Sequence, residues 1–554
     1  MRTPVTLFLL ALVARLVVAA GFPDPAYPDS FYYVDVARQL AAGHGFSVDF
    51  VWIFAEVGGR IPANPVLPIA SNAHWMPLAS LIQVPFIAVL GPTAMASALP
   101  FAICGAFAAP LAWAIGRDAG APSYVSVGAG VLTALPALSF VYMAQPDNFS
   151  LYQPLVAGSL FLAGRGMRGN PRAFILAGLL AGIATLSRND GVLVLAVLGA
   201  TFLWDRLRTR VSLGIGPRRP ARIPLLAALG AVALFACAVG PWYARQLAVF
   251  GTLSPSAASG KVLFIRDIGE WNSITIPATL DHLLGMGWGP LLMTRIGGLV
   301  AAAFIFSVLV GALVLVPFLI VGVWHRRRDA AFGPYYGYAA LLFAFSAIVS
   351  AVHVPGGTFI HSAVALAPHG YVLALWGIVV AVAWVGRRRR AWDPRAAARI
   401  FVAGAAAFGV ATAVVGAFTV HAGWAVKRDR ALAVAGALDQ AGAAASDRVM
   451  SIDASGTRYW TGRGGVVLVN DPLETVEQVA RSYDIRWLVL EKADGVPATK
   501  GILLDGARPA WVGVPVLDTG EVAVYPVCTN PADDRCAAGG ADTVDGVPDP
   551  GDGA

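Results

Sequence analysis

Charged residues are scarce in this sequence. Only 13% of its 554 residues are Asp, Glu, Lys or Arg, whereas 57% are hydrophobic, and the mean hydropathy is +0.66. Soluble globular proteins carry roughly 25% charged residues, so this composition excludes an ordinary soluble domain. It indicates a polytopic α-helical membrane protein.

Several motifs of nucleotide and metal chemistry are also missing. The sequence contains no Walker loop, no dinucleotide-binding glycine pattern and no metal-type spacing of Cys and His, which argues against nucleotide-dependent transport. It shows no internal repeat, although many transporters contain one. Of its few cysteines, Cys528 and Cys536 are close in sequence, and an oxidising compartment would allow a disulfide between them.

The net charge of +7 comes from arginines in short loops between apolar stretches. A nucleic-acid-binding protein gathers such charge on one face, whereas arginines beside apolar stretches orient helices in a bilayer. The positive-inside rule makes these connections cytoplasmic. They contain Arg117; Arg165, Arg168 and Arg172; Arg206, Arg208, Arg210, Arg218, Arg219 and Arg222; Arg326, Arg327 and Arg328; and Arg387, Arg388, Arg389, Arg390, Arg395 and Arg399.

Apolar stretches close to the length of about 20 residues that spans a bilayer recur about eleven times. The first could also be a signal peptide, but Arg15 within it favours a retained helix. The shorter stretch 76–91 would place every later arginine outside if it were a span, so we expect it to lie at the outer interface. The expected spans are 4–20, 94–116, 122–143, 148–164, 173–187, 190–205, 223–241, 298–324, 335–351, 362–385 and 400–420.

This topology predicts three parts of the chain. Residues 1–425 form a transmembrane domain with a cytoplasmic N-terminus and a large first extracytoplasmic loop, and residues 426–527 form a small extracytoplasmic α/β domain. Residues 528–554 are rich in Gly, Asp and Pro, which predicts a disordered tail. The α/β prediction rests on strand patterns at 449–452, 466–469, 487–490 and 522–525, with a helical pattern at 473–483.

Two aspartates lie on the predicted outer side. Asp29 precedes apolar residues at positions 33, 36, 37 and 40, the spacing of an amphipathic helix lying on the membrane. Position alone favours an N-cap role for Asp29. Asp147 follows Pro146 at a membrane face, where a carboxylate is costly unless it is solvated or paired. Capping explains Asp147 equally well, and only the two motifs together favour catalysis.

Other polar residues share this outer side. Arg188 and Asp190 could simply neutralise one another, and Arg245 could snorkel to the interface. Outer cations without a role are nevertheless disfavoured by the positive-inside rule. His361 could be a packed core histidine. The candidate binding residues are His74, Arg188, Asp190, Arg245, Lys261 and His361.

In their order along the chain, these motifs resemble the GT-C superfamily of integral-membrane glycosyltransferases. The branch that holds protein O-mannosyltransferases and lipid A aminoarabinose transferases is the most similar. Members often carry Lys-Pro or His-Pro-Pro where this chain has His74-Trp75-Met76-Pro77. The resemblance is carried by Asp29, Tyr32, Tyr33, Ala37 and Leu40; Pro77-Leu78; Pro146-Asp147; Arg188 to Gly191; Pro241-Trp242 with Arg245; and, in the α/β domain, Tyr459 to Gly462 and Trp487 to Leu490.

The resemblance implies an inverting hexosyl- or pentosyltransferase in the plasma or inner membrane. It would move a sugar from a polyprenyl-phosphate donor to a lipid, glycan or protein acceptor at the extracytoplasmic face. Asp29 would be the general base, and Asp147 would orient a substrate or hold a cation. The candidate binding residues would contact the donor, where protein cations can neutralise the departing phosphate.

No metal, other cofactor or nucleic acid is expected as a requirement. One alternative function is a transporter or flippase of polyprenyl-linked lipids or glycans, without covalent chemistry, because intramembrane charges also mark transport pathways. Another is a scaffold or receptor whose external domain binds a partner.

Overall fold

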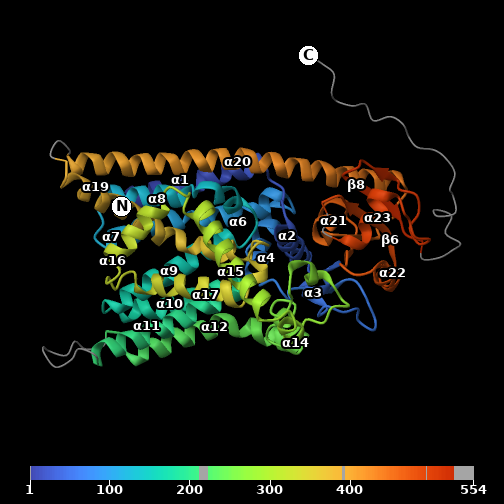
Figure 1. Cartoon of the computed structure of the whole chain (residues 1–554), viewed down its shortest axis with the longest axis horizontal. Coiled ribbons are helices and arrows are strands. Elements are labelled where there is room, and N and C mark those ends of the chain that lie inside the picture. The colour runs from blue at the N-terminus through green and yellow to red at the C-terminus, as the bar shows by residue number, and fades with distance from the viewer. Residues whose placement is uncertain (1, 211–221, 390–392, 494–495, 529–554) are drawn as a thin grey trace, which may run out of the picture.

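The computed structural model describes residues 2–210, 222–389, 393–493 and 496–528. It is an elongated bundle of helices with a small α/β unit at one end (Figure 1). Residues outside the described ranges include Arg218, Arg219, Arg390, Cys536 and the tail beyond Cys528, and the side chains of Arg208 and Arg210 are also not described. The disulfide and the disorder of the tail therefore stay predictions.

Each expected span coincides with one or more helices. Among the described residues, six helices are long and apolar enough to cross a membrane, or up to seven if the bent pair α8 and η1 is one span. The bundle contains α1 (Arg2–Gly21), α6 (Ala94–Ala106), α7 (Ala108–Asp118), α8 (Ser123–Ala134), η1 (Ala137–Ala144), α9 (Phe149–Met167), α10 (Pro171–Ser187), η2 (Asn189–Gly191), α11 (Val192–Arg210), α12 (Leu225–Phe250), α15 (Trp288–Ile305), η4 (Phe306–Val310), α16 (Val316–Arg326), α17 (Gly333–Ile348), η5 (Ala351–His353), α18 (Thr358–Ala363), η6 (Val364–Leu366), α19 (Ala367–Gly386) and α20 (Pro394–Gln440).

The expected count of about eleven spans is not confirmed, because several expected spans are short or broken. The expected span 298–324 is interrupted by the π-helix η4 and by Ala312 and Leu313, whose φ angles are 47° and 51°. Such left-handed residues cannot continue a right-handed helix. The predicted span 173–187 corresponds to α10, which is apolar but shorter than a full span.

A bend between α8 and η1 directs the chain toward the start of α9, where Asp147 lies. The two helices are bent by 53°, and Pro136 stands between them. Proline has no N–H for the helical ladder, and its ring moves the preceding residue out of the helical conformation. The chain after η1 therefore reaches residues 145–148 inside the bundle, where Asp147 and Asn148 are buried.

The predicted first outer loop forms compact structure over the end of the bundle that faces the α/β unit. The predicted helix is present as α2, but it begins one residue before Asp29 and not at or after it, and Ser30 to Ala37 are buried on all faces. It contacts α4, α5 and α21, so it does not have the exposed polar face expected of a helix lying on the membrane. The loop contains α2 (Pro28–Ala41), β1 (Ser47–Val48), β2 (Phe50–Val51), α3 (Ile53–Glu56), β3 (Ile69–Ala70), α4 (Leu78–Leu81) and α5 (Val84–Leu90).

The stretch expected at the interface forms two short helices, α4 and α5. Pro77 precedes the first helix and Pro85 lies in the first turn of the second. Together, Leu78–Leu90 are apolar but shorter than a span. Their position at the lipid interface stays a prediction.

All of the predicted C-terminal strands are present, in a mixed sheet of order β2-β5-β4-β6-β8-β7. The strand β2 comes from the first outer loop and pairs in parallel with β5, Val51 opposite Val466. Gly465 is required there, because a Cβ atom would lie 1.8 Å from the carbonyl oxygen of Val449. The unit consists of β4 (Arg448–Ser451), α21 (Ala454–Thr461), β5 (Gly465–Val467), α22 (Leu473–Ser482), β6 (Ile485–Glu491), α23 (Pro497–Asp505), β7 (Leu517–Asp518) and β8 (Val522–Pro526).

The α/β unit shares its core with the first outer loop. Phe50 and Trp75 of the loop pack in one apolar cluster with Met450, Val466 and Leu488 of the sheet. The helix α20 runs without a break along the bundle and through the boundary predicted at residue 426 (Figure 1). The third outer loop, with α13 (Pro255–Ala258), η3 (Ile268–Asn272) and α14 (Leu280–Leu284), lies at the same end of the molecule.

Candidate active site

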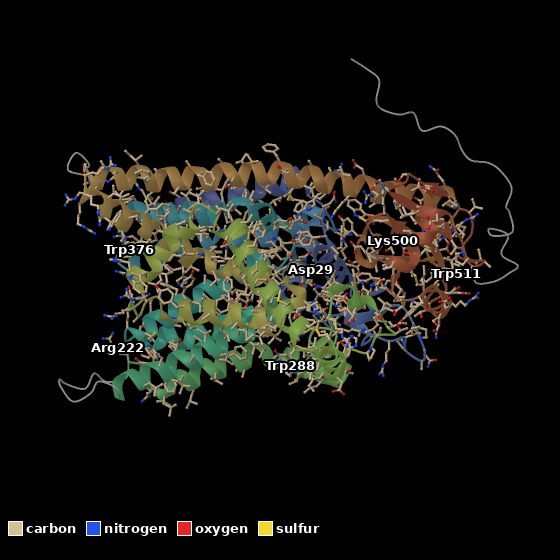
Figure 2. All side chains as sticks on the ribbon, viewed as in Figure 1. Asp29, Arg222, Trp288, Trp376, Lys500 and Trp511 are labelled. Atoms are coloured by element: carbon tan, nitrogen blue, oxygen red, sulfur yellow. The ribbon has the colours of Figure 1, made fainter. Side chains whose placement is uncertain are left out.

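Asp29 lies where the bundle meets the α/β unit (Figure 2). It is in the first turn of α2 and does not cap it, since the residue at the N-cap is Tyr27. Its Oδ1 atom accepts a hydrogen bond of 2.9 Å from Nε1 of Trp75, whose ring stacks on Tyr32 with centroids 4.0 Å apart. Burial raises the pKa of the Asp29 carboxyl above its ordinary value, while Trp75 and Arg188 oppose that shift.

Asp147 is fully buried beside Asp29. Its Oδ2 atom accepts a hydrogen bond of 2.8 Å from the phenol of Tyr27, and its Oδ1 atom accepts one of 2.5 Å from the backbone N–H of Asn148. Burial, followed by the negative charge of Asp29, raises the pKa of Asp147 to about 7. Two carboxylates that share a site in this way resist ionising together.

His361 lies between the two aspartates. Its Nε2 atom is 3.9 Å from Oδ2 of Asp29, and its Nδ1 atom is 3.7 Å from Oδ2 of Asp147. The ring stacks on Phe149 with centroids 4.1 Å apart. The three polar side chains each offer one ligand atom, all within 4.8 Å of one another, so they could hold a metal ion. Carboxylate and imidazole ligands suit several divalent cations.

The predicted pair of Arg188 and Asp190 is present at the same site. Nε of Arg188 lies 3.0 Å from Oδ1 of Asp190 and donates to Oγ of Ser362 at 3.2 Å, while the Ser362 hydroxyl also donates to Asp190. The carboxylate therefore orients the guanidinium in addition to neutralising it. Within the described part of the chain, the Nη1 group of Arg188 has no hydrogen-bond partner and remains available to a ligand.

A chain of hydrogen bonds ties the end of α10 to α2. Oγ of Ser187 donates to Oδ1 of Asn148 at 3.0 Å, and Nδ2 of Asn148 donates to the phenol oxygen of Tyr33 at 2.5 Å. Asn189 donates to the backbone oxygen of His74 at 3.1 Å. These contacts fix the relative positions of the three segments that carry the candidate residues.

A cavity of about 900 Å³ joins these groups to an apolar groove. Its apolar part lies between the η4 region and α17. Its polar part is lined by Asp29, His74, Asn148, Arg188, Asp190 and His361, and its apolar part by Ile305, Leu309, Leu342 and Phe345. Asp147 is not part of the lining but contacts it through Tyr27, Asn148 and His361. The cavity is thus suited to an amphiphile with a polar head and an apolar tail.

Two candidate cations do not line this cavity. Nη2 of Arg245 donates to the backbone oxygen of Ser71 at 2.9 Å, and its guanidinium lies over the ring of Trp242. Nζ of Lys261 donates to the backbone oxygens of Ser273 and Ile276, at 2.6 and 2.9 Å. Both cations hold outer loops in place. Contact of either one with a donor phosphate stays a prediction.

His74 lines the cavity as an uncharged ring. Burial, followed by the charge of Arg188, lowers its pKa to about 3. It lies edge-on to Trp75, with ring centroids 5.0 Å apart. His74 can therefore offer a hydrogen bond to a ligand but no positive charge near neutral pH.

The sequence did not single out Tyr27 or Trp75, the side chains that hold the two carboxylates. Trp75 adjoins His74 in the sequence His74-Trp75-Met76-Pro77, and its indole N–H is a possible hydrogen-bond donor. Tyr27 had no pattern to mark it. Its contact with Asp147 spans 120 positions of the chain, which only the fold brings together.

Comparisons with known proteins agree with this architecture. The family model for dolichyl-phosphate-mannose-protein mannosyltransferases matches residues 73–242. That segment contains Asp147 and Arg188 but not Asp29 or His361. No curated protein sequence matches the chain.

The solved structures that are similar to it include three that match most of its length. One is ArnT from Cupriavidus metallidurans bound to undecaprenyl phosphate, with a TM-score of 0.50 and 14% identity over 95% of this chain and 98% of that chain. The apo state of the same protein has a TM-score of 0.52 and 14% identity, over 94% of this chain and 97% of that chain. The oligosaccharyltransferase of Archaeoglobus fulgidus in complex with Zn and sulfate has a TM-score of 0.52 and 13% identity, over 91% of this chain and 71% of that chain.

The predicted resemblance to the GT-C superfamily is thereby confirmed at the level of the fold. The chain is a multi-pass membrane protein with the fold of the GT-C glycosyltransferases.

Proposed function

We propose that this protein is a glycosyltransferase that transfers a sugar from a polyprenyl-phosphate donor to an acceptor at the extracytoplasmic face of the cell membrane. One observation carries the proposal: a single cavity joins Asp29 and Arg188 to an apolar groove. A donor of this kind is itself an amphiphile, with an anionic sugar phosphate on an apolar chain. The undecaprenyl phosphate bound to ArnT, a protein of similar fold, supports the same donor class.

In the proposed reaction, an acceptor hydroxyl attacks the anomeric carbon of the donor sugar. Asp29 accepts the hydroxyl proton while the bond between the anomeric carbon and the phosphate oxygen breaks. The carrier leaves as polyprenyl phosphate, and attack opposite the leaving group inverts the anomeric carbon. The raised pKa of Asp29 brings it nearer the range in which a general base is effective.

Arg188 supplies the positive charge that the departing phosphate requires. Its Nε group is held by Asp190, and its remaining donors lie along the cavity. A preorganised guanidinium stabilises charge that develops on phosphate oxygens. His74 and His361 are further hydrogen-bonding groups of the same lining.

Asp147 and His361 orient Asp29 in this mechanism. Tyr27 holds Asp147 in place, and His361 lies between both carboxylates. The proposed reaction requires no metal or other cofactor, because Arg188, together with hydrogen bonds from His74 and His361, can stabilise the charge on the departing phosphate. A metal ion at the three-residue cluster would instead bind both carboxylates, and chelation distinguishes the two mechanisms.

The proposal can be tested with purified protein in nanodiscs, incubated with radiolabelled polyprenyl-phosphate sugars and a crude envelope extract. Label that moves from the carrier to an extract component, and does not move with Asp29→Asn, would support the transferase. Binding or flipping of the same lipids without transfer would instead indicate a transporter.

A further inference from the structure

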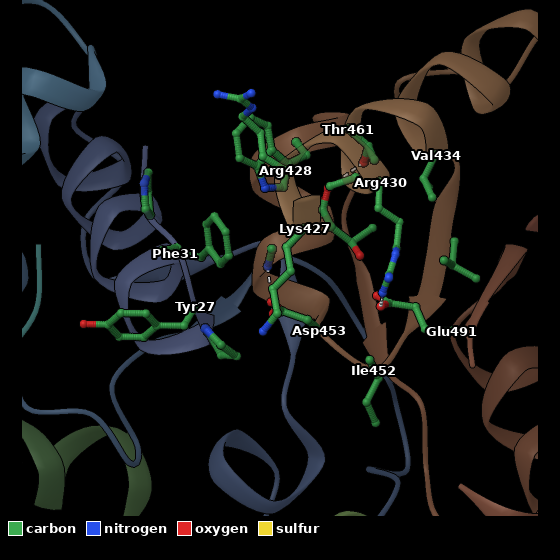
Figure 3. Close-up of a pocket in the computed structure, with 18 of the residues that line it drawn as sticks. Tyr27, Phe31, Lys427, Arg428, Arg430, Val434, Ile452, Asp453, Thr461 and Glu491 are labelled. Carbon is green, nitrogen blue, oxygen red and sulfur yellow. Dashed lines mark hydrogen bonds and ion pairs between the residues drawn. The ribbon is translucent and has the colours of Figure 1, made fainter. Parts of the chain in front are cut away.

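A second cavity lies at the junction of the bundle and the α/β unit. Its volume is about 420 Å³, and its walls come from α2, α20, α21 and the segment after α1 (Figure 3). Aromatic rings of Phe31, Trp424 and Trp460 form much of its apolar lining. It shares Tyr27 and Trp52 with the larger cavity, so the two are neighbours.

Basic side chains of α20 enter this junction cavity. Nη1 of Arg430 lies 2.9 Å from Oε2 of Glu491, and Nη2 of Arg428 lies 2.9 Å from Oδ1 of Asp429. Lys427 is exposed and points between α2 and α21 (Figure 3). Among the described residues, no hydrogen bond or ion pair engages its ammonium group, although its charge acts on the nearby carboxyl of Asp453. Its positive charge is therefore available to a ligand.

The acidic groups of the lining are already engaged. Oδ1 of Asp453 accepts hydrogen bonds from the backbone N–H of Gly456 and the hydroxyl of Ser455, both at 2.8 Å. Glu491 is paired with Arg430. Burial raises the pKa of Asp453 to about 6, while its hydrogen bonds and the charge of Lys427 oppose that shift. The lining contains three basic side chains, Lys427, Arg428 and Arg430, against the two acidic ones, and so favours an anion near Lys427.

The junction cavity also lies beside the expected edge of the bilayer. Phe22 directly follows α1, and Trp424 lies on α20 beyond its most apolar part. Apolar side chains on the outer face of α20 are exposed, with 76% of Phe418 and 61% of Val426 accessible. Exposed apolar residues on a spanning helix contact lipid, and Trp is enriched at membrane interfaces.

We propose that the junction cavity binds the anionic head group of a membrane lipid from the leaflet nearest the α/β unit. Lys427 would contact the lipid phosphate, since an ammonium group binds phosphate as a point charge. The aromatic rings would surround the apolar part of the head-group region. Its position beside the bilayer favours a lipid over a soluble anion, and the proposal does not depend on the transferase activity.

The proposal can be tested by native mass spectrometry of the full-length protein, delipidated in detergent. The probes are short-chain phosphatidylglycerol, short-chain phosphatidylcholine and inorganic phosphate. The variant Lys427→Ala is compared with Lys500→Ala, which removes an exposed lysine of α23 that does not line the cavity. Trp460→Ala provides a second change within the lining.

We expect wild type and Lys500→Ala to bind one molecule of phosphatidylglycerol more tightly than one molecule of phosphatidylcholine. Lys427→Ala should weaken that binding about tenfold, as expected for loss of a charged hydrogen bond, and Trp460→Ala should weaken binding of both lipids. Equal phosphatidylglycerol binding by wild type and Lys427→Ala would overturn the proposal. So would binding of inorganic phosphate at Lys427 without any preference for phosphatidylglycerol, which would assign the cavity to a soluble anion.

Discussion

The phenol of Tyr27 donates a hydrogen bond of 2.8 Å to Oδ2 of Asp147. This contact joins the N-cap of α2, the helix that carries Asp29, to the turn before α9 that carries Asp147. Tyr27 also forms part of both cavities. It therefore connects the active site with the junction cavity.

Tyr27→Phe should lower the transfer rate modestly, about tenfold, the lower range for a hydrogen bond to a charged group. The hydrogen bond from Tyr27 opposes the rise in the pKa of Asp147, so its loss should also move the acidic limb of the pH–rate profile to higher pH. Steady-state rates across a pH series measure both effects. Tyr124→Phe, on α8 and outside both cavities, is the control. An unchanged acidic limb would show that Tyr27 does not act on Asp147.

Asp29→Asn should lower turnover by about 10²- to 10⁴-fold, the usual contribution of a general base. The amide keeps the shape of the side chain and can still meet the indole of Trp75, so the thermal unfolding temperature should change little. Transfer of radiolabel from the carrier measures the rate. Asp505→Asn, at an exposed position of the α/β unit, provides the matched control. Turnover equal to that of wild type would show that Asp29 is not the general base.

Activity should fall as the pH drops through neutrality. The carboxylates must be charged to accept a proton or orient the base, and burial raises the pKa of Asp147 to about 7 and that of Asp29 above its ordinary value. The active form is therefore about half present near pH 7, becomes fully present at higher pH and is lost as the pH falls below 7. Asp147→Asn removes a neighbouring negative charge, so the residual activity should extend to lower pH. A profile that stays flat to pH 5 would contradict this assignment.

Arg188→Ala should raise the KM for the polyprenyl-phosphate donor by about tenfold or more, because a charged hydrogen bond to phosphate is lost. Donor titration at saturating acceptor measures this change. Arg245→Ala is the informative comparison. Since Arg245 bonds to Ser71 and contacts Trp242, we expect that variant to lower the unfolding temperature and leave the donor KM unchanged. A raised donor KM in Arg245→Ala and an unchanged one in Arg188→Ala would instead show that Arg245 contacts the phosphate.

Prolonged dialysis against a chelator should leave the transfer rate unchanged if protein groups alone neutralise the phosphate. Metal content before and after dialysis, measured by mass spectrometry, shows whether an ion has been removed. Loss of activity that Mn²⁺ or Zn²⁺ restores would instead assign a metal to Asp29, Asp147 and His361, whose ligand atoms lie within 4.8 Å of one another. In that case His361→Ala should weaken metal binding.

Much of the secondary structure follows from the sequence, because its signals are local. The helix after Asp29, the strands near Val449, Val466 and Leu488 and the helices of the bundle all have apolar spacing that neighbouring residues determine. The positions of the helix breaks at Pro136 and Ala312 are harder to predict from the sequence. They depend on how each helix packs against its neighbours as well as on composition.

The sequence by itself determined a multi-pass helical protein, because scarce charge and long apolar stretches are compatible with few other environments. It also placed Asp29, Asp147 and Arg188 among the candidates. Only the tertiary structure decided that His361 lies between the two aspartates, that Lys261 is held by loop carbonyls and that β2 joins the C-terminal sheet. These contacts join residues far apart in the chain, and local spacing contains no information about which distant segments pack together.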